Sequence, residues 1–328
     1  MQNVSRRSFL AGASLAATAC AVSPMRAMAS RSPFRVAVIT DEISQDFDHA
    51  CFIAAKEFGM QWVELRGMWK KGLQDLADSE IADALKILTK YSLRVTDIAS
   101  PLFKVDWPGA PPTKHASNSS HSSETLKQQD AVLAQSIVLA KKFSTDKVRC
   151  FDFWRLDDVA PYRSAINAKL LEAAETCGKQ GILLVLENEF ECNTATARES
   201  VATLAGVPSP HLALNWDAGN AVMRGELDAF PVGWDLLPKH CIHHCHVKNA
   251  VQSLDGKIAW SPVGTGIIDW TAQFRLLKRA GYRDAVSLET HWRGAATPEE
   301  STRASWAGMN KHCTMREHYN EYSSARRR

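Results

Sequence analysis

Short apolar runs alternate with longer amphipathic stretches from residue 35 to beyond residue 290, and this alternation constrains the fold more than any other feature. Apolar runs of this length predict strands, and stretches with apolar side chains at helical spacing predict helices. Each strand is expected to be followed by a helix, although the helix after the sixth strand is poorly defined. The strands are expected at 35–40, 61–67, 93–100, 147–154, 182–189, 211–217, 242–249 and 285–292.

Strands that alternate with helices predict a parallel sheet, and two architectures fit this pattern. Eight units in roughly 295 residues fit a single (β/α)8 TIM barrel. The alternative is a doubly wound open sheet, which carries a Gly-rich phosphate-binding turn after its first strand. The segment "VITDEISQD" has acids there instead, so the barrel is favoured. The Ser/Pro-rich segment 104–122 is then expected to be a loop at the top of the barrel, where it could cover a site.

The N-terminus reads "SRRSFLAGASLAATACAVSPMRAMAS" and predicts a twin-arginine export signal. Arg6 and Arg7 precede an Ala-rich apolar run, and small residues permit cleavage after Ala29. Residues 1–29 are therefore expected to be a signal peptide and residues 30–328 the barrel domain of a periplasmic or secreted protein. A disordered basic N-terminus is the alternative.

The charge balance bears on the partners of the protein, and the cysteine content bears on whether it has disulfides. Three of the 39 basic residues and no acid lie in the first 29 residues, which leaves 36 residues of each sign. This balance gives no reason to expect a nucleic-acid partner or, after signal cleavage, a membrane partner. The other seven cysteines are odd in number and scattered, which does not indicate a disulfide framework.

The segment "HCIHHCH" at 240–246 places four histidines and two cysteines on the seventh expected strand. Side chains alternate along a strand, so His244, His246 and Lys248 share one face, and Cys241 and Cys245 share the other. A strand cannot wrap all of these side chains around one ion. We therefore expect His246 to be a ligand in the barrel and the cysteines to pack outward against helices.

Acidic residues end three of the last four expected strands. Glu187 ends the fifth strand, Asp217 the sixth and Glu289 the eighth, and His246 ends the seventh. Active-site residues of a barrel lie at the C-terminal ends of its strands. A lone carboxylate at a strand end is more often a helix cap or an ion-pair partner, but four residues able to bind a metal at four consecutive strand ends predict one divalent metal ion. An oxygen-rich ligand set suits Mn²⁺ first, with Mg²⁺, Co²⁺, Fe²⁺ or Zn²⁺ as alternatives.

The chain resembles the xylose isomerase-like TIM barrel superfamily, in its sugar (phosphate) isomerase/epimerase branch. The resemblance spans roughly residues 35–293 and rests on the quartet in order and on "VELRG", "DAGN", "HVK" and "SPVGTGIIDW". It implies that Glu187, Asp217, His246 and Glu289 bind the metal, and that Glu187 and Glu289 are also the catalytic acid/base pair. Three departures from the pattern, Glu189, Asn220 and Asn249, concern the substrate more than the metal.

The function implied by the resemblance is a metal-dependent isomerase or epimerase of a small-molecule carbohydrate, which removes a proton beside a carbonyl to give an enediolate. A lyase or dehydratase acting on a 3-keto-sugar, 3-keto-glycoside or inosose is the main alternative, because the same proton abstraction can expel a leaving group. A hydrolase and a non-catalytic sugar-binding barrel are further alternatives. The metal, the sugar and the state of assembly, monomer or homo-oligomer, stay open. Substrate contacts are expected from Glu64, Trp154, Asn220, Lys248, His291 and Arg293.

Overall fold

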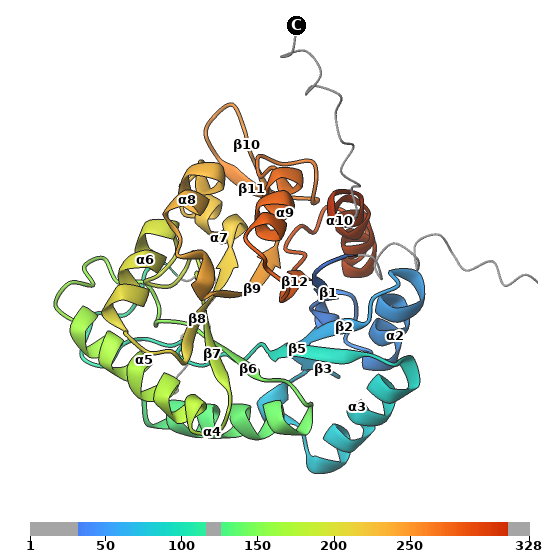
Figure 1. Cartoon of the computed structure of the whole chain (residues 1–328), viewed down its shortest axis with the longest axis horizontal. Coiled ribbons are helices and arrows are strands. Elements are labelled where there is room, and N and C mark those ends of the chain that lie inside the picture. The colour runs from blue at the N-terminus through green and yellow to red at the C-terminus, as the bar shows by residue number, and fades with distance from the viewer. Residues whose placement is uncertain (1–31, 116–125, 314–328) are drawn as a thin grey trace, which may run out of the picture.

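The computed structural model of the chain describes residues 32–115 and 126–313. The expected signal peptide lies outside these residues, as do residues 116–122 of the expected 104–122 loop. Eight parallel strands form the central sheet at the expected places (Figure 1). They are β1 (Arg35–Val38), β2 (Trp62–Leu65), β5 (Arg94–Ile98), β6 (Lys147–Cys150), β7 (Leu183–Glu187), β8 (Leu212–Asp217), β9 (Ile242–Val247) and β12 (Ala285–Leu288).

The sheet closes into a barrel. Its strands pair in the order β1-β12-β9-β8-β7-β6-β5-β2, and a parallel bridge between Ile39 and Glu64 joins the two ends of this order. Closure leaves no free sheet edge and gives the barrel one C-terminal face, on which the ends of all strands meet. The predicted (β/α)8 barrel is therefore confirmed, and the open sheet is excluded.

Helices surround the strands (Figure 1) and bury the outward-facing apolar side chains. The longer ones are α3 (Asp78–Tyr91), α4 (Leu126–Lys142), α5 (Arg163–Gly178), α6 (Ala197–Gly206), α9 (Trp270–Arg279) and α10 (Pro298–Cys313). The shorter ones are α2 (Phe47–Phe52), α7 (Ala218–Met223), α8 (Trp234–Leu236) and the turns η1 (Thr40–Glu42), η2 (Ile53–Glu57), η3 (Leu73–Asp75), η4 (Ala229–Gly233) and η5 (Lys239–Cys241). In the described part of the chain, no helix has the length and apolar character needed to cross a membrane.

Alternation along the strands separates core residues from site residues. In β7, Leu184 and Leu186 belong to the apolar core, whereas Glu187 at the end of the strand points into the barrel. In β9, Cys245 packs in that core while His244 and His246 are buried inside the barrel. Cys241 was predicted to lie on one face of the seventh strand. It instead precedes β9, in the turn η5, and is only partly buried. The cysteines of the described residues are free thiols, in agreement with the expected lack of a disulfide framework.

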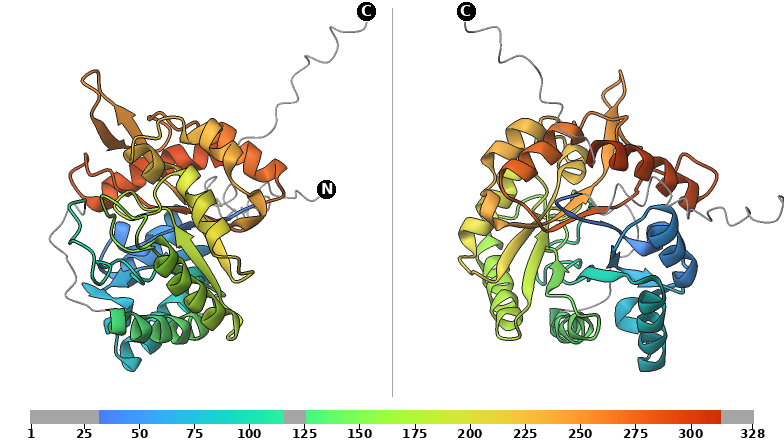
Figure 2. Two further views of the ribbon diagram at one scale, coloured as in Figure 1. Left: turned by 90° about the vertical axis from the view of Figure 1, so that its left-hand side faces the viewer. Right: turned by 45° about the vertical axis from the view of Figure 1, so that its right-hand side comes forward.

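Two hairpins stand on the C-terminal face. One pairs β3 (Gly67–Met68) with β4 (Lys71–Gly72), and the other pairs β10 (Asn249–Gln252) with β11 (Ile258–Ser261). The second hairpin follows β9 directly and projects beyond the helices in both views of Figure 2. The described part of the 104–122 loop is anchored to the segment after β6, where the Thr113 hydroxyl donates to the Arg155 carbonyl at 2.7 Å.

Candidate metal centre

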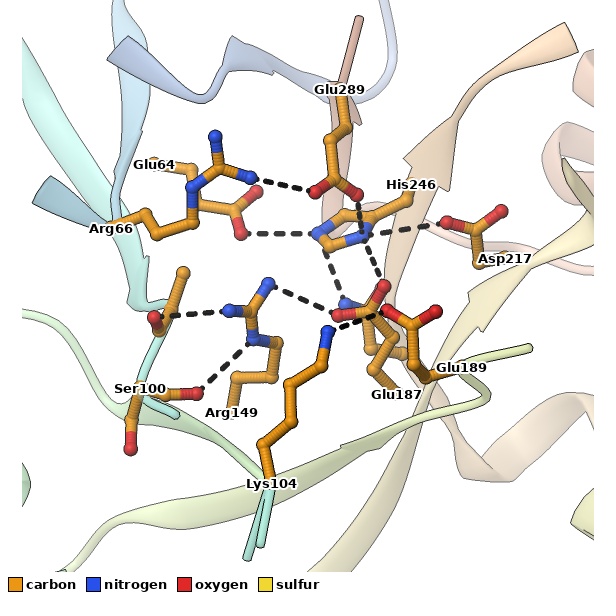
Figure 3. A network of polar contacts seen from close by, with 12 residues as sticks. Glu64, Arg66, Ser100, Lys104, Arg149, Glu187, Glu189, Asp217, His246 and Glu289 are labelled. Atoms are coloured by element: carbon orange, nitrogen blue, oxygen red, sulfur yellow. Dashed lines mark hydrogen bonds and ion pairs between the residues drawn. The ribbon is translucent and has the colours of Figure 1, made fainter. Parts of the chain in front are cut away.

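The four side chains predicted to bind a metal meet at the C-terminal ends of β7, β8, β9 and β12 (Figure 3). Each offers one ligand atom, and these atoms lie within 4.8 Å of one another. The Nδ1 atom of His246 is 2.9 Å from Glu289 Oε2, 3.2 Å from Glu187 Oε1 and 3.6 Å from Asp217 Oδ2. All four residues are buried. We refer to Glu187, Asp217, His246 and Glu289 as the quartet.

Local structure fixes the direction of the carboxylates. Asp217 ends β8 and also caps α7, since its Oδ1 atom accepts a hydrogen bond from the Asn220 amide at 2.9 Å. The helix-cap and ligand interpretations are thus compatible, because the cap uses one oxygen and turns the other toward His246. Asn220 also donates its side-chain amide to Glu187 Oε1 at 3.0 Å.

The ammonium group of Lys248 lies among the quartet. Its Nζ atom is 2.7 Å from Glu289 Oε2 and 2.8 Å from Asp217 Oδ2, and it donates to Asn220 Oδ1 at 3.2 Å. A buried cation at this point shows that the carboxylates create a place for positive charge. Lys248 and Asn220, both predicted to contact substrate, are therefore in direct contact with the predicted metal ligands.

Positive charge keeps the two glutamates of the quartet ionised. Burial raises the pKa of Glu187, but the charges of His246 and Arg149 outweigh burial and bring this pKa well below its usual value. Burial likewise raises the pKa of Glu289, and the charges of Lys248 and His246 outweigh it. Burial lowers the pKa of His246, but the surrounding carboxylates, led by Glu64, raise it well above the ordinary value.

The quartet fits a divalent cation. One buried oxygen of each carboxylate takes part in no hydrogen bond and is met only by an ion pair: Glu187 Oε2 by Arg149 at 3.0 Å, and Asp217 Oδ2 and Glu289 Oε2 by Lys248 at 2.8 and 2.7 Å. Buried carboxylate oxygens without hydrogen bonds are costly unless a cation neutralises them. Three carboxylates and one imidazole form a mostly oxygen ligand set, which suits Mn²⁺ or Mg²⁺ and also accepts Co²⁺, Fe²⁺ or Zn²⁺.

Glu64 contacts His246 on the ring nitrogen that does not face the carboxylates of the quartet. Its Oε1 atom is 3.0 Å from the Nε2 atom of His246, and the residue is fully buried. His244 continues this arrangement toward Asp97, with 3.2 Å between its Nε2 and Asp97 Oδ1. A carboxylate on Nε2 holds the imidazole with Nδ1 toward the quartet, as is usual for a metal-binding histidine. This contact makes Glu64 a positioning residue for His246.

Three basic side chains at the site were not found by sequence reasoning (Figure 3). Arg149, on β6, pairs with Glu187 Oε2 at 3.0 Å and donates to the carbonyl oxygens of Ala99 and Ser100. Arg66 pairs with Glu289 Oε1 at 2.9 Å, and Lys104 pairs with Glu189 Oε2 at 3.1 Å. A charged residue between Val148 and Cys150, at an inward position of an apolar strand, was the available signal for Arg149.

The remaining predicted substrate residues surround the quartet at different depths. His291 is partly exposed, with Nε2 3.2 Å from Glu289 Oε1. Arg293 pairs with Glu42 and bonds to the Thr290 carbonyl, at the edge of the site. Trp154 is buried in a small cluster with Phe151 and Cys192, and the Lys104 ammonium lies 5.4 Å from the centroid of its ring. Substrate contact by these residues stays a prediction.

Comparison with known proteins relates this geometry to a family. The model of the family described as xylose isomerase-like TIM barrel matches residues 52–312. No curated protein shows significant sequence similarity to the chain.

Solved structures share the fold at low sequence identity. A xylose isomerase-like TIM barrel protein from Mycobacterium smegmatis in complex with magnesium has a TM-score of 0.63 at 17% identity, covering 87% of this chain and 98% of that one. The probable 3-DHS dehydratase AsbF involved in petrobactin synthesis, from Bacillus anthracis, has a TM-score of 0.62 at 18% identity, covering 84% and 97%. An L-ribulose 3-epimerase has a TM-score of 0.60 at 19% identity, covering 90% and 99%.

Proposed function

The chain belongs to the xylose isomerase-like TIM barrel family, and from this premise we propose that it is a divalent-metal-dependent enzyme that removes a proton beside the carbonyl of a sugar. The observation that carries the proposal is the position of Glu187 and Glu289. Both carboxylates are buried beside His246 Nδ1, both have a lowered pKa, and each has one oxygen that is met only by an ion pair, with Arg149 or Lys248. Two ionised carboxylates at one site can take a proton from one carbon and return it.

The residues of the quartet would hold the metal, Mn²⁺ first among the alternatives, through Glu187, Asp217, His246 and Glu289. When bound, the ion would supply a positive charge that stabilises negative charge developing on the carbonyl oxygen of the substrate. The protein's own part is to keep the glutamates ionised and in place. Arg149 and Asn220 hold Glu187, and Arg66 holds Glu289.

A neutral sugar fits the charge of the site better than a phosphorylated one. The network of ion pairs around the quartet contains eight acids and five Lys or Arg side chains, and each of these five contacts a carboxylate. The acids are Asp41, Glu42, Glu64, Asp97, Glu187, Glu189, Asp217 and Glu289, and the bases are Arg66, Lys104, Arg149, Lys248 and Arg293. A divalent ion offsets most of this excess, whereas a phosphate group would add to it.

Isomerisation or epimerisation is the first form of the proposed reaction, with Glu187 and Glu289 exchanging the proton. A lyase or dehydratase acting on a 3-keto-sugar, 3-keto-glycoside or inosose is the second, and the position of His291 favours it. This side chain is partly exposed and next to Glu289 Oε1, where an imidazolium can protonate a departing oxygen. The similarity of fold to a probable dehydratase is compatible with this second form.

Proton NMR in D₂O tests the proposal. The Mn²⁺-loaded protein is incubated with ketoses, inososes and 3-keto-glycosides, the Mn²⁺ is removed by chelation, and the products are recorded. We expect deuterium at a carbon beside the carbonyl, and no exchange after prior metal removal or in Glu187→Gln and Glu289→Gln. An epimer as product supports the first form and an eliminated enone the second. Absence of exchange across the panel with metal bound would refute proton abstraction on these sugars.

We also propose that the protein is exported by the twin-arginine pathway, on the basis of the sequence at 5–30. Mass spectrometry of protein from a periplasmic fraction should give a chain that begins at Ser30. Replacing Arg6 and Arg7 by lysine should leave the full-length chain in the cytoplasm, and processing of that variant as efficient as in the wild type would contradict the proposal.

A further inference from the structure

The hairpin β10–β11 places an aromatic ring beside the quartet. β10 starts one residue after Lys248, and its pairing with β11 sets Trp260 opposite Ala250, close to the base of the hairpin. The Lys248 ammonium, which contacts Asp217 and Glu289, lies over the Trp260 ring at 5.5 Å from its centroid. One face of the indole is thus turned toward the metal ligands.

Two more side chains meet Trp260 from separate loops. His291, which follows β12, lies 4.9 Å from the Trp260 ring at an interplanar angle of 80°. Phe190, which follows β7, lies 6.1 Å away at 69°. All three side chains are partly exposed, whereas the quartet beside them is buried. Together they make a partly exposed aromatic wall, which we define as Phe190, Trp260 and His291.

Gly219, at the start of α7, permits the Trp260 ring and Lys248 to pack closely against this helix. A Cβ atom on Gly219 would lie 2.8 Å from Lys248 Cβ and 3.2 Å from Trp260 Cζ3. The first distance is shorter than side chains tolerate, so glycine at 219 lets β9 and the Trp260 ring pack against the start of α7. The position of the ring is therefore part of the construction of the site.

Core packing alone does not account for the wall. Trp260 does contact the apolar core. A large aromatic side chain that serves only for packing, however, contributes most to the stability of the fold when it is fully buried, as Trp216 and Trp270 are. A partly exposed indole beside a buried cluster of polar groups has an apolar surface available to a ligand that those groups bind.

We propose that Trp260 is a substrate-binding platform and that the site takes ring-closed, neutral sugars in preference to open-chain ones. A closed ring that keeps its carbonyl, as in a 3-keto-pyranoside or an inosose, has one continuous face of C–H groups, which covers an indole while the oxygen atoms on its edge meet the quartet. An open-chain polyol has no such face. The proposal specifies the substrate class of the reaction proposed above and rests on it for the role of the carbonyl, but the platform itself is tested by binding alone.

The test measures binding of two carbonyl-free probes to the Mg²⁺-loaded protein by saturation-transfer NMR and calorimetry. The probes are methyl β-glucopyranoside, which is ring-closed, and glucitol, which is open-chain. We expect the wild type to prefer the glucoside. Trp260→Ala should weaken glucoside binding about ten-fold, the equivalent of about 1.4 kcal/mol. It should leave glucitol binding within about two-fold, and Trp260→Phe should keep most of the affinity.

Trp62→Ala is the matched control. Trp62 is also partly exposed, but it starts β2 at the opposite end of the barrel, where the Arg94 guanidinium lies over its ring. This variant should bind both probes like the wild type. Unfolding curves of all variants show whether a loss of binding comes from a loss of folding.

Three results would overturn the platform: no preference of the wild type for the glucoside, equal weakening of both probes in Trp260→Ala, or failure of Trp260→Phe to restore binding in a folded protein. Because neither probe carries a carbonyl, these results are independent of proton abstraction. Absence of deuterium exchange together with Trp260-dependent glucoside binding would refute the proposed reaction and leave the platform standing.

Discussion

Replacing Arg149 by methionine should reveal how strongly the centre depends on a buried counter-charge. The side chain of Arg149 is 6% exposed, and its guanidinium group lies 3.0 Å from Glu187 Oε2 and donates to two main-chain carbonyl oxygens. Methionine fills a similar volume but leaves Glu187 with a buried charge and the carbonyl oxygens of Ala99 and Ser100 without their donor. Removal of one partner from a buried ion pair costs about 3–5 kcal/mol. Domains are stable by only about 5–15 kcal/mol, so the effect should be large.

Urea unfolding of the metal-free protein measures this cost. The variant should lose about 3–5 kcal/mol at neutral pH. Mn²⁺ should stabilise the variant more than the wild type, because a bound ion replaces the missing positive charge near Glu187. Acid sensitivity gives a third readout. The pKa of Glu187 is lower in the folded state than its unfolded value of 4.5. The ionised side chain therefore stabilises the fold above pH 4.5, and this stabilisation is lost as the pH falls.

Without Arg149 that folded pKa rises, so the variant should lose its remaining stability at a higher pH than the wild type. The matched control is Arg163→Met, which removes the partner of the buried Asp152 outside the quartet. It should destabilise the fold without changing the stabilisation that Mn²⁺ provides. A cost below about 1 kcal/mol for Arg149→Met, the value of an exposed pair, would refute the reasoning. So would equal metal stabilisation of Arg149→Met and the wild type.

Two further predictions concern positioning and pH. Glu64→Gln keeps the shape of the side chain but removes the charge that faces His246 Nε2, so it should weaken Mn²⁺ binding by about 10–100-fold in a titration. Unchanged affinity would show that Glu64 does not position the imidazole. Burial raises the pKa of Asp284, but the hydrogen bond to His243 and the charge of Lys147 bring it to about 2. Its stabilisation is therefore present above pH 3.8 and is lost as the pH falls toward 2. Asp284→Asn should cost about 1–2 kcal/mol at neutral pH and almost nothing near pH 2, by thermal unfolding, and a cost independent of pH would contradict this assignment.

The barrel and the quartet were accessible from the sequence because both follow from local patterns. A strand such as 182–189 is an apolar run of the right length, and the rule that sites lie at strand ends then selects Glu187. Asp217, His246 and Glu289 follow in the same way, and the structure brings these side chains together. Whether they bind a metal stays a prediction.

The other features of the site depend on contacts between segments that are distant in the sequence, and a local sequence pattern does not specify such contacts. The contact of Glu64 with His246 depends on the bridge between Ile39 and Glu64, and substrate contact by Glu64 stays a prediction. Lys248 was assigned to the inner face, but the depth that its ammonium group reaches depends on the three-dimensional arrangement of the carboxylates. The hairpin that carries Trp260 was not predicted, although "DG" at 255–256 was a local turn signal.

The central claim is that four side chains from four consecutive barrel strands form one divalent-metal site. Titration of the metal-free protein with Mn²⁺, followed by electron paramagnetic resonance, tests it most directly. The expected result is one ion per chain in the wild type and in Asp152→Asn, a control for a buried acid outside the quartet. Asp217→Asn, with the fold intact, should bind far more weakly. A wild-type protein that takes up no ion, or an Asp217→Asn variant that binds as well as the wild type, would contradict the account.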